Sequence, residues 1–192
     1  MNIKHIIEDS GQITAILREG NYLWIGYILS GVAKLRKVSA LDPTSIYFDI
    51  TILDSTKINK IIDIGTYISL AVDSDSYIGV TIHKFTPLTT YWYHNKPGTV
   101  TENAISVAYS PTYLYFLTPG IFPIKSKLLK INCGSMTIDS SIDIEKDGDI
   151  IYDARDIDID SNNNLWVVTY TNPIKLVKIN TTLVVQLIRY LG

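Results

Sequence analysis

Hydrophobic and polar residues alternate with a period of two along most of the chain, and no stretch keeps a helical period over several turns. Such alternation places every second side chain on one face of a β-strand. Short turns rich in Gly, Asn, Asp and Ser separate the alternating stretches, and these residues favour tight turns. The pattern predicts an all-β protein built from many short antiparallel strands.

One sequence motif recurs: an alternating strand, a polar turn, and a second strand that begins with aliphatic or aromatic residues. Its four copies cover residues 13–26, 68–80, 105–116 and 155–168. Anchored on Trp24, Gly79, Tyr115 and Trp166, the copies are spaced 55, 36 and 51 residues apart. This spacing brackets the roughly 40–50 residues of one propeller blade. The repeat predicts a small β-propeller of about four blades, each a four-stranded antiparallel sheet, in a single domain over residues 1–192.

The repeats are assigned to residues 12–64, 66–101, 104–151 and 154–190, and residues 1–11 to a closing strand. In this register residues 58–64 form the outer strand of the first repeat and residues 46–53 an additional strand. The second repeat then lacks an outer strand. Residues 3–7 share the isoleucine pattern of 58–62, which predicts an outer strand that closes the ring or completes a blade of a neighbouring subunit.

The fourth copy, residues 158–170 followed by 175–180, resembles the repeats of the NHL, virginiamycin-B-lyase-like and two-component-regulator propellers. The first copy, residues 13–26, is similar to the regulator type. The resemblance implies a propeller fold, which serves many unrelated functions. A lyase would need a catalytic histidine with acidic partners, and His5, His83 and His94 match no such motif.

Composition narrows the function classes. Hydrophobic residues make up 46% of the chain and charged residues 19%, which is typical of a folded protein. The net charge of −2, without basic clusters, favours neither nucleic acid nor an anionic membrane as a partner. Cys133 is the only cysteine and is interpreted as a small buried side chain. The early acidic residues of the N-terminus do not resemble a signal peptide, so we expect a cytoplasmic or virion location.

Aromatic residues provide the candidate binding positions. Tyr91, Trp92 and Tyr93 are consecutive, so on a strand Trp92 faces one side and both tyrosines the other. They form either an exposed surface for a protein or a carbohydrate, or a contact buried on both sides. Phe122, in a proline-rich loop, is either an exposed anchor or part of a loop that protects a sheet edge. Trp24 and Trp166 are predicted to lie in the core between blades.

Asp156, Asp158 and Asp160 alternate in the fourth copy and are weak metal candidates. The EF-hand pattern fails, because Ser161 stands where its glycine belongs. A solvent-facing strand and turn is the favoured interpretation, without a metal.

No phosphate-binding, nucleotide-binding or nucleophile motif is present, so no cofactor and no catalytic residue are assigned. The sequence favours a non-catalytic interaction or scaffold module that binds a protein partner or assembles with itself. A structural role in a phage or viral particle is the finer expectation. The alternatives are a carbohydrate-binding propeller and a lyase or hydrolase acting at the propeller axis.

Overall fold

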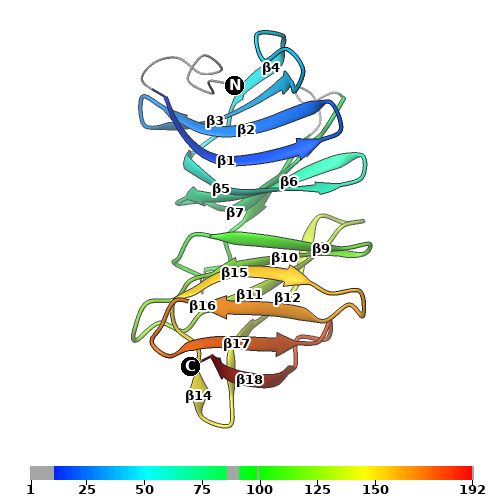
Figure 1. Ribbon diagram of the computed structural model, residues 1–192. Coiled ribbons are helices and arrows are strands. Elements are labelled where there is room, and N and C mark those ends of the chain that lie inside the picture. Colours follow the sequence, from blue (N-terminus) through cyan, green and yellow to red (C-terminus); the bar gives the residue numbers. More distant parts are fainter. Residues whose placement is uncertain (1–10, 86–90, 99, 192) are drawn as a thin grey trace. The chain divides into compact units, whose positions relative to one another are not determined.

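The computed structural model describes residues 11–85, 91–98 and 100–191 (Figure 1). Their regular structure consists of 18 strands, most of them in four four-stranded antiparallel sheets. The predicted all-β, propeller-like fold with about four such sheets is confirmed. Within these ranges no helix is long and apolar enough to cross a membrane.

The chain divides into two compact units, Met1–Asn95 and Lys96–Gly192. Each unit contains two of the four-stranded sheets. In every four-stranded sheet the strands follow one another in chain order, so each of these sheets is a simple meander.

Unit 1 (Met1–Asn95) starts with the sheet β1–β4, visible in blue and cyan in Figure 1. Its strands are β1 (Gln12–Glu19), β2 (Tyr22–Leu29), β3 (Val32–Ser39) and β4 (Ile46–Thr51). The second sheet comprises β5 (Ser55–Ile64), β6 (Tyr67–Ser74), β7 (Tyr77–His83) and β8 (Tyr91–Asn95). β5 packs across β1, β2 and β3, so the two sheets lie face to face.

Buried aliphatic side chains of both sheets fill the core of unit 1, together with Trp24, which is 0% exposed. The sheets approach each other closely where Gly26 of β2 meets Ile58 of β5. A Cβ atom at position 26 would lie 2.9 Å from the Ile58 Cβ, well inside van der Waals contact. A glycine at this point of β2 therefore allows the close packing of the two sheets.

Unit 2 (Lys96–Gly192) repeats this arrangement. Its first sheet comprises β9 (Ser106–Ser110), β10 (Tyr113–Thr118), β11 (Lys127–Asn132) and β12 (Thr137–Asp143). A two-stranded hairpin follows, β13 (Glu145–Lys146) and β14 (Asp149–Ile150). The second sheet comprises β15 (Ala154–Ile159), β16 (Leu165–Thr169), β17 (Ile174–Ile179) and β18 (Val185–Leu191). β15 packs on β9 over a separate core that includes Tyr115, Leu128 and Val177.

The predicted strand assignment is wrong in the first half of the chain. Residues 58–64 lie in β5, which pairs with β6 and begins the second sheet instead of ending the first. Residues 46–51 are β4, the fourth strand of the first sheet rather than an addition to it. The second sheet does have a fourth strand, β8. The error arises because every hairpin of a meander combines alternating strands with a polar turn.

Other predicted elements are in place. The expected third strands are β3, β11 and β17, and the expected last strand is β18. The predicted strand over residues 3–7 lies outside the described residues. Trp24 is confirmed as a core residue, whereas Trp166 is half-buried and lies outside the buried cluster. The indole Nε1 of Trp166 donates to Asp160 Oδ2 (2.9 Å) in the turn between β15 and β16.

Candidate functional site

Strand β8 carries the three consecutive aromatic residues. In the antiparallel register with β7, Trp92 pairs with Thr81 and Tyr93 with Val80. Trp92 is half-buried and packs edge-on against Tyr67, with 5.3 Å between ring centroids. The side chain of Tyr91 lies outside the described residues. Trp92 and Tyr93 are half-buried and pack against other rings, which lies between the two predicted alternatives of exposure and full burial.

Tyr93 supports a second feature of unit 1. Its ring packs against Tyr77 at a centroid distance of 4.6 Å. Its hydroxyl oxygen accepts a hydrogen bond from the backbone N–H of Leu53 (3.0 Å), in the turn between β4 and β5. Leu53 lines an open cavity of about 560 Å³, which we call the unit 1 cavity. Tyr93, a candidate binding residue from the sequence, therefore supports a cavity that the sequence did not predict.

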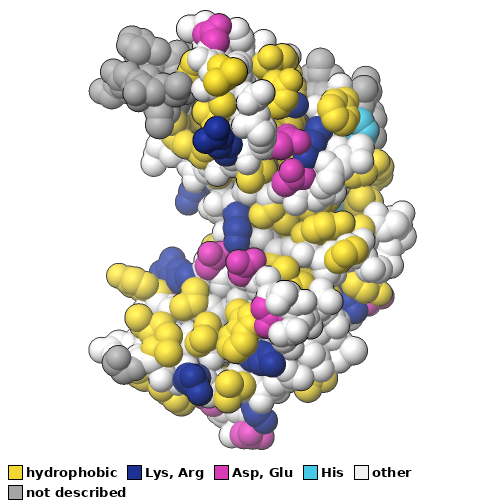
Figure 2. All heavy atoms as spheres, turned by 45° about the vertical axis from the view of Figure 1, so that its right-hand side comes forward, with side chains coloured by type: hydrophobic (Ala, Val, Ile, Leu, Met, Phe, Trp, Pro, Cys, Tyr) yellow, Lys and Arg dark blue, Asp and Glu magenta, His cyan; other side chains and the backbone are white. Residues whose placement is uncertain are grey.

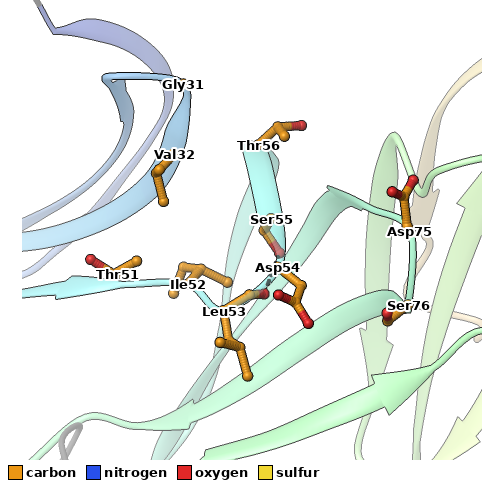
Figure 3. A pocket seen from close by; sticks show the side chains of 10 residues that line it. All are labelled: Gly31, Val32, Thr51, Ile52, Leu53, Asp54, Ser55, Thr56, Asp75 and Ser76. Carbon is orange, nitrogen blue, oxygen red and sulfur yellow. Dashed lines mark hydrogen bonds between the residues drawn. The ribbon is translucent and has the colours of Figure 1, made fainter.

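Three connections of unit 1 surround the unit 1 cavity (Figure 3). They are the turn between β2 and β3, the turn between β4 and β5, and the turn between β6 and β7. The lining residues are Gly31, Val32, Thr51, Ile52, Leu53, Asp54, Ser55, Thr56, Asp75 and Ser76. All come from turns or strand ends, so the only sequence signal for this site was the polar composition of the turns.

The ends of β1 and β5 and the residue that follows β7 form a charged cluster in unit 1. Lys84 is 4% exposed, and its Nζ lies 2.5 Å from Glu19 Oε1 and 2.7 Å from Asp63 Oδ1. Trp24 Nε1 donates to the other oxygen of the Glu19 carboxylate (2.8 Å). Lys84 and Glu19 therefore bind to other residues of the fold.

Lys37 lies in the same region but contacts aromatic rings. Its side chain is 7% exposed, with Nζ 4.3 Å from the ring centroid of Tyr22 and 4.7 Å from that of Trp24. Burial lowers the pKa of Lys37; the Glu19 carboxylate opposes this shift and Lys84 adds to it. The alternating pattern does not reveal these contacts, because Lys37 lies in β3 and both rings lie in β2.

Phe122 lies in unit 2 on the loop 119–126, which we call the Phe122 loop. Its side chain is 78% exposed, and Ile121 and Ile124 on the same loop are exposed as well. The Phe122 ring contacts Tyr152 edge-on, at a centroid distance of 5.6 Å. Large apolar side chains therefore reach solvent side by side on a short connection between β10 and β11.

Buried contacts hold the base of the Phe122 loop. Ser126 is buried, its backbone N–H donates to Ile151 O (2.8 Å), and its hydroxyl donates to Pro119 O. The backbone N–H of Ala154 donates to the same hydroxyl (3.2 Å). Gly120 has a φ of 61°, and a Cβ there would lie 2.3 Å from the Ser126 nitrogen, so only glycine fits.

The three weak metal candidates each have their own partners. Asp156 and Asp158 are exposed on β15, and each accepts a hydrogen bond from the next backbone N–H. Asp160 accepts hydrogen bonds from Trp166 Nε1 and from the side chain and backbone of Asn164. These bonds, the indole donor first, hold the pKa of Asp160 well below its usual range. Within the described residues, no group of three His, Cys, Asp or Glu side chains is placed to hold a metal ion.

His94 has a hydrogen-bond partner within the fold, and Cys133 is partly shielded from solvent. His94 is buried, with Nε2 2.9 Å from the Thr81 hydroxyl. Burial raises the pKa of the Cys133 thiol to about 11, so it is protonated at neutral pH. On the face drawn in Figure 2, hydrophobic side chains reach the surface of both units, interspersed with charged and other polar groups.

Comparisons with known proteins add information about the fold. No family model matches the sequence, and no curated protein matches it. The extracellular domain of a hybrid two-component system from B. thetaiotaomicron is similar in structure, with a TM-score of 0.61 and 17% identity over 92% of this chain. AztD from Citrobacter koseri has a TM-score of 0.58 and 11% identity over 94% of this chain. Glutaminyl cyclase from Myxococcus xanthus has a TM-score of 0.57 and 8% identity over 91% of this chain.

The chain spans only part of most of these proteins. It covers 21% of the two-component system domain, 47% of AztD and 68% of the cyclase. At these identities the likeness is one of fold. It agrees with the resemblance of the first repeat to two-component-regulator propellers, while membership of a particular propeller family stays a prediction.

Proposed function

We propose that the chain is a non-catalytic scaffold module that assembles with copies of itself through the Phe122 loop. The observation that carries this proposal is the contrast between the exposed apolar tip of the loop and its buried, hydrogen-bonded base. Buried aromatic anchors supply most of the binding energy in many interfaces. A loop already held in shape loses little conformational entropy on docking.

A second feature of unit 2 supports self-assembly. Among the described strands, β18 pairs in a sheet with β17 alone, and its Leu187 and Leu191 side chains are exposed. A side-chain hydrogen bond from the Tyr190 hydroxyl to Asp149 links β18 to β14. An apolar edge strand is a template for pairing with another chain. Unit 2 therefore displays both an anchor and an open apolar edge, which together can form a contact between two copies. A structural role in a phage or viral particle is the finer form of this proposal.

The proposal that the chain is non-catalytic is supported by the contacts of its acidic, basic and nucleophilic side chains. Lys84, Glu19, Asp160 and His94 each have polar partners within the fold, and the Cys133 thiol is protonated at neutral pH. Catalysis requires an acid, base or nucleophile free to meet a substrate. These side chains instead stabilise turns and strand ends.

Light scattering after size-exclusion chromatography, over a wide range of concentrations, tests the proposal. We expect the wild-type chain to form oligomers that Phe122→Ser dissociates, because the substitution removes the apolar anchor. Tyr170→Ser is the matched control, since Tyr170 is 74% exposed in the same unit but lies outside the loop. A wild-type chain that stays monomeric at every concentration, or oligomers that survive Phe122→Ser, would contradict self-assembly through this loop.

A further inference from the structure

One face of the sheet β15–β18 lies outside the core of unit 2 (Figure 1). The opposite face supplies Ile157, Val167, Val177 and Ile188 to that core. Because side chains alternate along each strand, the antiparallel register fixes which residues share the other face, which we call the outer face. Its apolar residues are Trp166, Val168, Ile174, Leu176, Leu187 and Leu191. None of the six belongs to the described core cluster of unit 2.

The outer face combines an apolar centre with charged margins. Ile174, Leu187 and Leu191 are 43%, 40% and 42% exposed, and the other three apolar residues are half-buried. Exposed charged residues flank them, Asp158 on the first strand of the sheet and Arg189 on the last. An apolar centre within a polar rim is the usual composition of a protein interface. The outer face therefore has the character of a surface that another protein covers.

The Phe122 loop has matching chemistry. Its tip, residues 121–124, carries no charged side chain and presents Ile121, Phe122 and Ile124 to solvent. An uncharged apolar tip can cover an apolar surface without removing a charge from water. The loop connects β10 and β11, whereas the outer face belongs to the next four-stranded sheet. One copy of unit 2 therefore carries both an apolar projection and a separate apolar surface that can receive it.

We propose that the Phe122 loop of one copy docks on the outer face of the sheet β15–β18 of a second copy. This inference rests on the proposed self-assembly through the Phe122 loop and names the surface that the loop contacts. Phe122 packs against Leu176 and Leu187 of the second copy, while Asp158 and Arg189 stay at the solvated rim. The two surfaces of such a contact differ, so each added copy leaves one loop and one face free. Assembly then proceeds head to tail.

Size-exclusion chromatography with light scattering on the full chain tests the acceptor surface. We expect the average mass of the wild type to rise with concentration, as head-to-tail growth requires. Leu187→Gln should raise the dissociation constant about tenfold, because it places an amide in the apolar centre of the contact. Val184→Gln is the matched control, since Val184 is 56% exposed in the neighbouring turn and lies outside the outer face. Thermal melts followed by circular dichroism verify that both variants keep the fold.

A mixture of two variants distinguishes unlike from like surfaces. Phe122→Ser keeps the outer face and loses the anchor, whereas Leu187→Gln keeps the anchor and damages the face. We expect each variant alone to be monomeric at a concentration where the wild type assembles. Mixed in equal amounts, they should form dimers and nothing larger, because only one intact loop and one intact face can meet.

Two results would overturn the acceptor surface and leave self-assembly through the loop standing. One is a wild type that Phe122→Ser dissociates but Leu187→Gln does not. The other is a mixture that stays monomeric, which would show that the contact joins two loops or two outer faces. A wild-type chain that is monomeric at every concentration would overturn both this inference and the proposed function, and would leave the outer face to a different protein.

Discussion

Two buried lysines illustrate how neighbouring residues with the same charge have different roles. Lys84 contacts two carboxylates, whereas Lys37 faces aromatic rings and its pKa is lowered by burial. We expect Lys84→Met to lower the free energy of unfolding at pH 7 by about 1–3 kcal/mol, because it leaves Glu19 and Asp63 without their cation. The melting temperature should fall accordingly. Lys37→Met should melt no lower than the wild type, because methionine keeps the ring contacts without a buried charge.

The pH dependence separates the two effects for Lys37. Between its lowered folded-state pKa and the unfolded value of 10.5, the unfolded chain binds a proton that the folded chain lacks. The wild type therefore gains stability as pH rises through this window, relative to Lys37→Met. Thermal melts of both proteins at pH 7 and pH 10 should show the advantage of the variant shrinking at pH 10. A Lys37→Met protein that melts as low as Lys84→Met at pH 7 would show that the ammonium–ring contacts stabilise the fold.

Cys133 should be a slow nucleophile. With its pKa raised to about 11 by burial, very little thiolate is present at pH 8. We expect alkylation by iodoacetamide at pH 8 to be about a hundredfold slower than for an ordinary cysteine, because only the thiolate reacts. Mass spectrometry of timed samples measures the rate, and the protein unfolded in guanidinium serves as the control. Equal rates in the folded and unfolded protein would contradict the burial of this thiol.

At the scale of elements, the sequence predicted strands well and their grouping less well. The third and fourth repeats agree with the sheets because their turns, around Ser110–Thr112 and Ser161–Asn164, separate the first two strands of each sheet. In the second repeat the matching turn lies between β6 and β7, the second and third strands. Alternation shows which side chains share a face, but it does not show which hairpin of a meander is which.

The candidate sites could likewise be predicted only where they depend on the local sequence. Phe122 could be predicted as exposed because it stands in a proline-rich loop, a local property of the sequence. The unit 1 cavity could not, because Val32, Asp54 and Asp75 come from three separate turns. Their meeting depends on how the two sheets stack. That stacking depends on details such as the glycine opposite Ile58, which alternation alone does not reveal.

Gly26→Ala tests the stacking of the two sheets in unit 1. The added methyl group would lie 2.9 Å from the Ile58 Cβ, so one sheet must shift. We expect a loss of about 1–3 kcal/mol in the free energy of unfolding, the usual effect of overpacking a core. Gly98→Ala is the control, because a Cβ there meets nothing within 4 Å. Equal stability of both variants in urea titrations would contradict the close approach of β2 and β5.

At the scale of the whole molecule, the division into two units bears on how the chain unfolds. The sequence predicts one domain over residues 1–192, yet each unit has two sheets and its own buried core. A region with its own core can unfold as a separate cooperative unit. We therefore expect differential scanning calorimetry of the full chain to give a calorimetric enthalpy larger than the van't Hoff enthalpy, because a single two-state transition requires the two to be equal.

Two core variants assign the transitions to the units. Leu70→Ala removes a buried side chain from the core of unit 1, and Leu128→Ala does the same in unit 2. Each should cost about 2–5 kcal/mol, because both leucines are fully buried. If the units unfold separately, Leu70→Ala lowers one transition and Leu128→Ala the other, while the remaining transition keeps its temperature. If both variants lower a single transition with equal enthalpies, the chain unfolds as the one domain that its repeats predict.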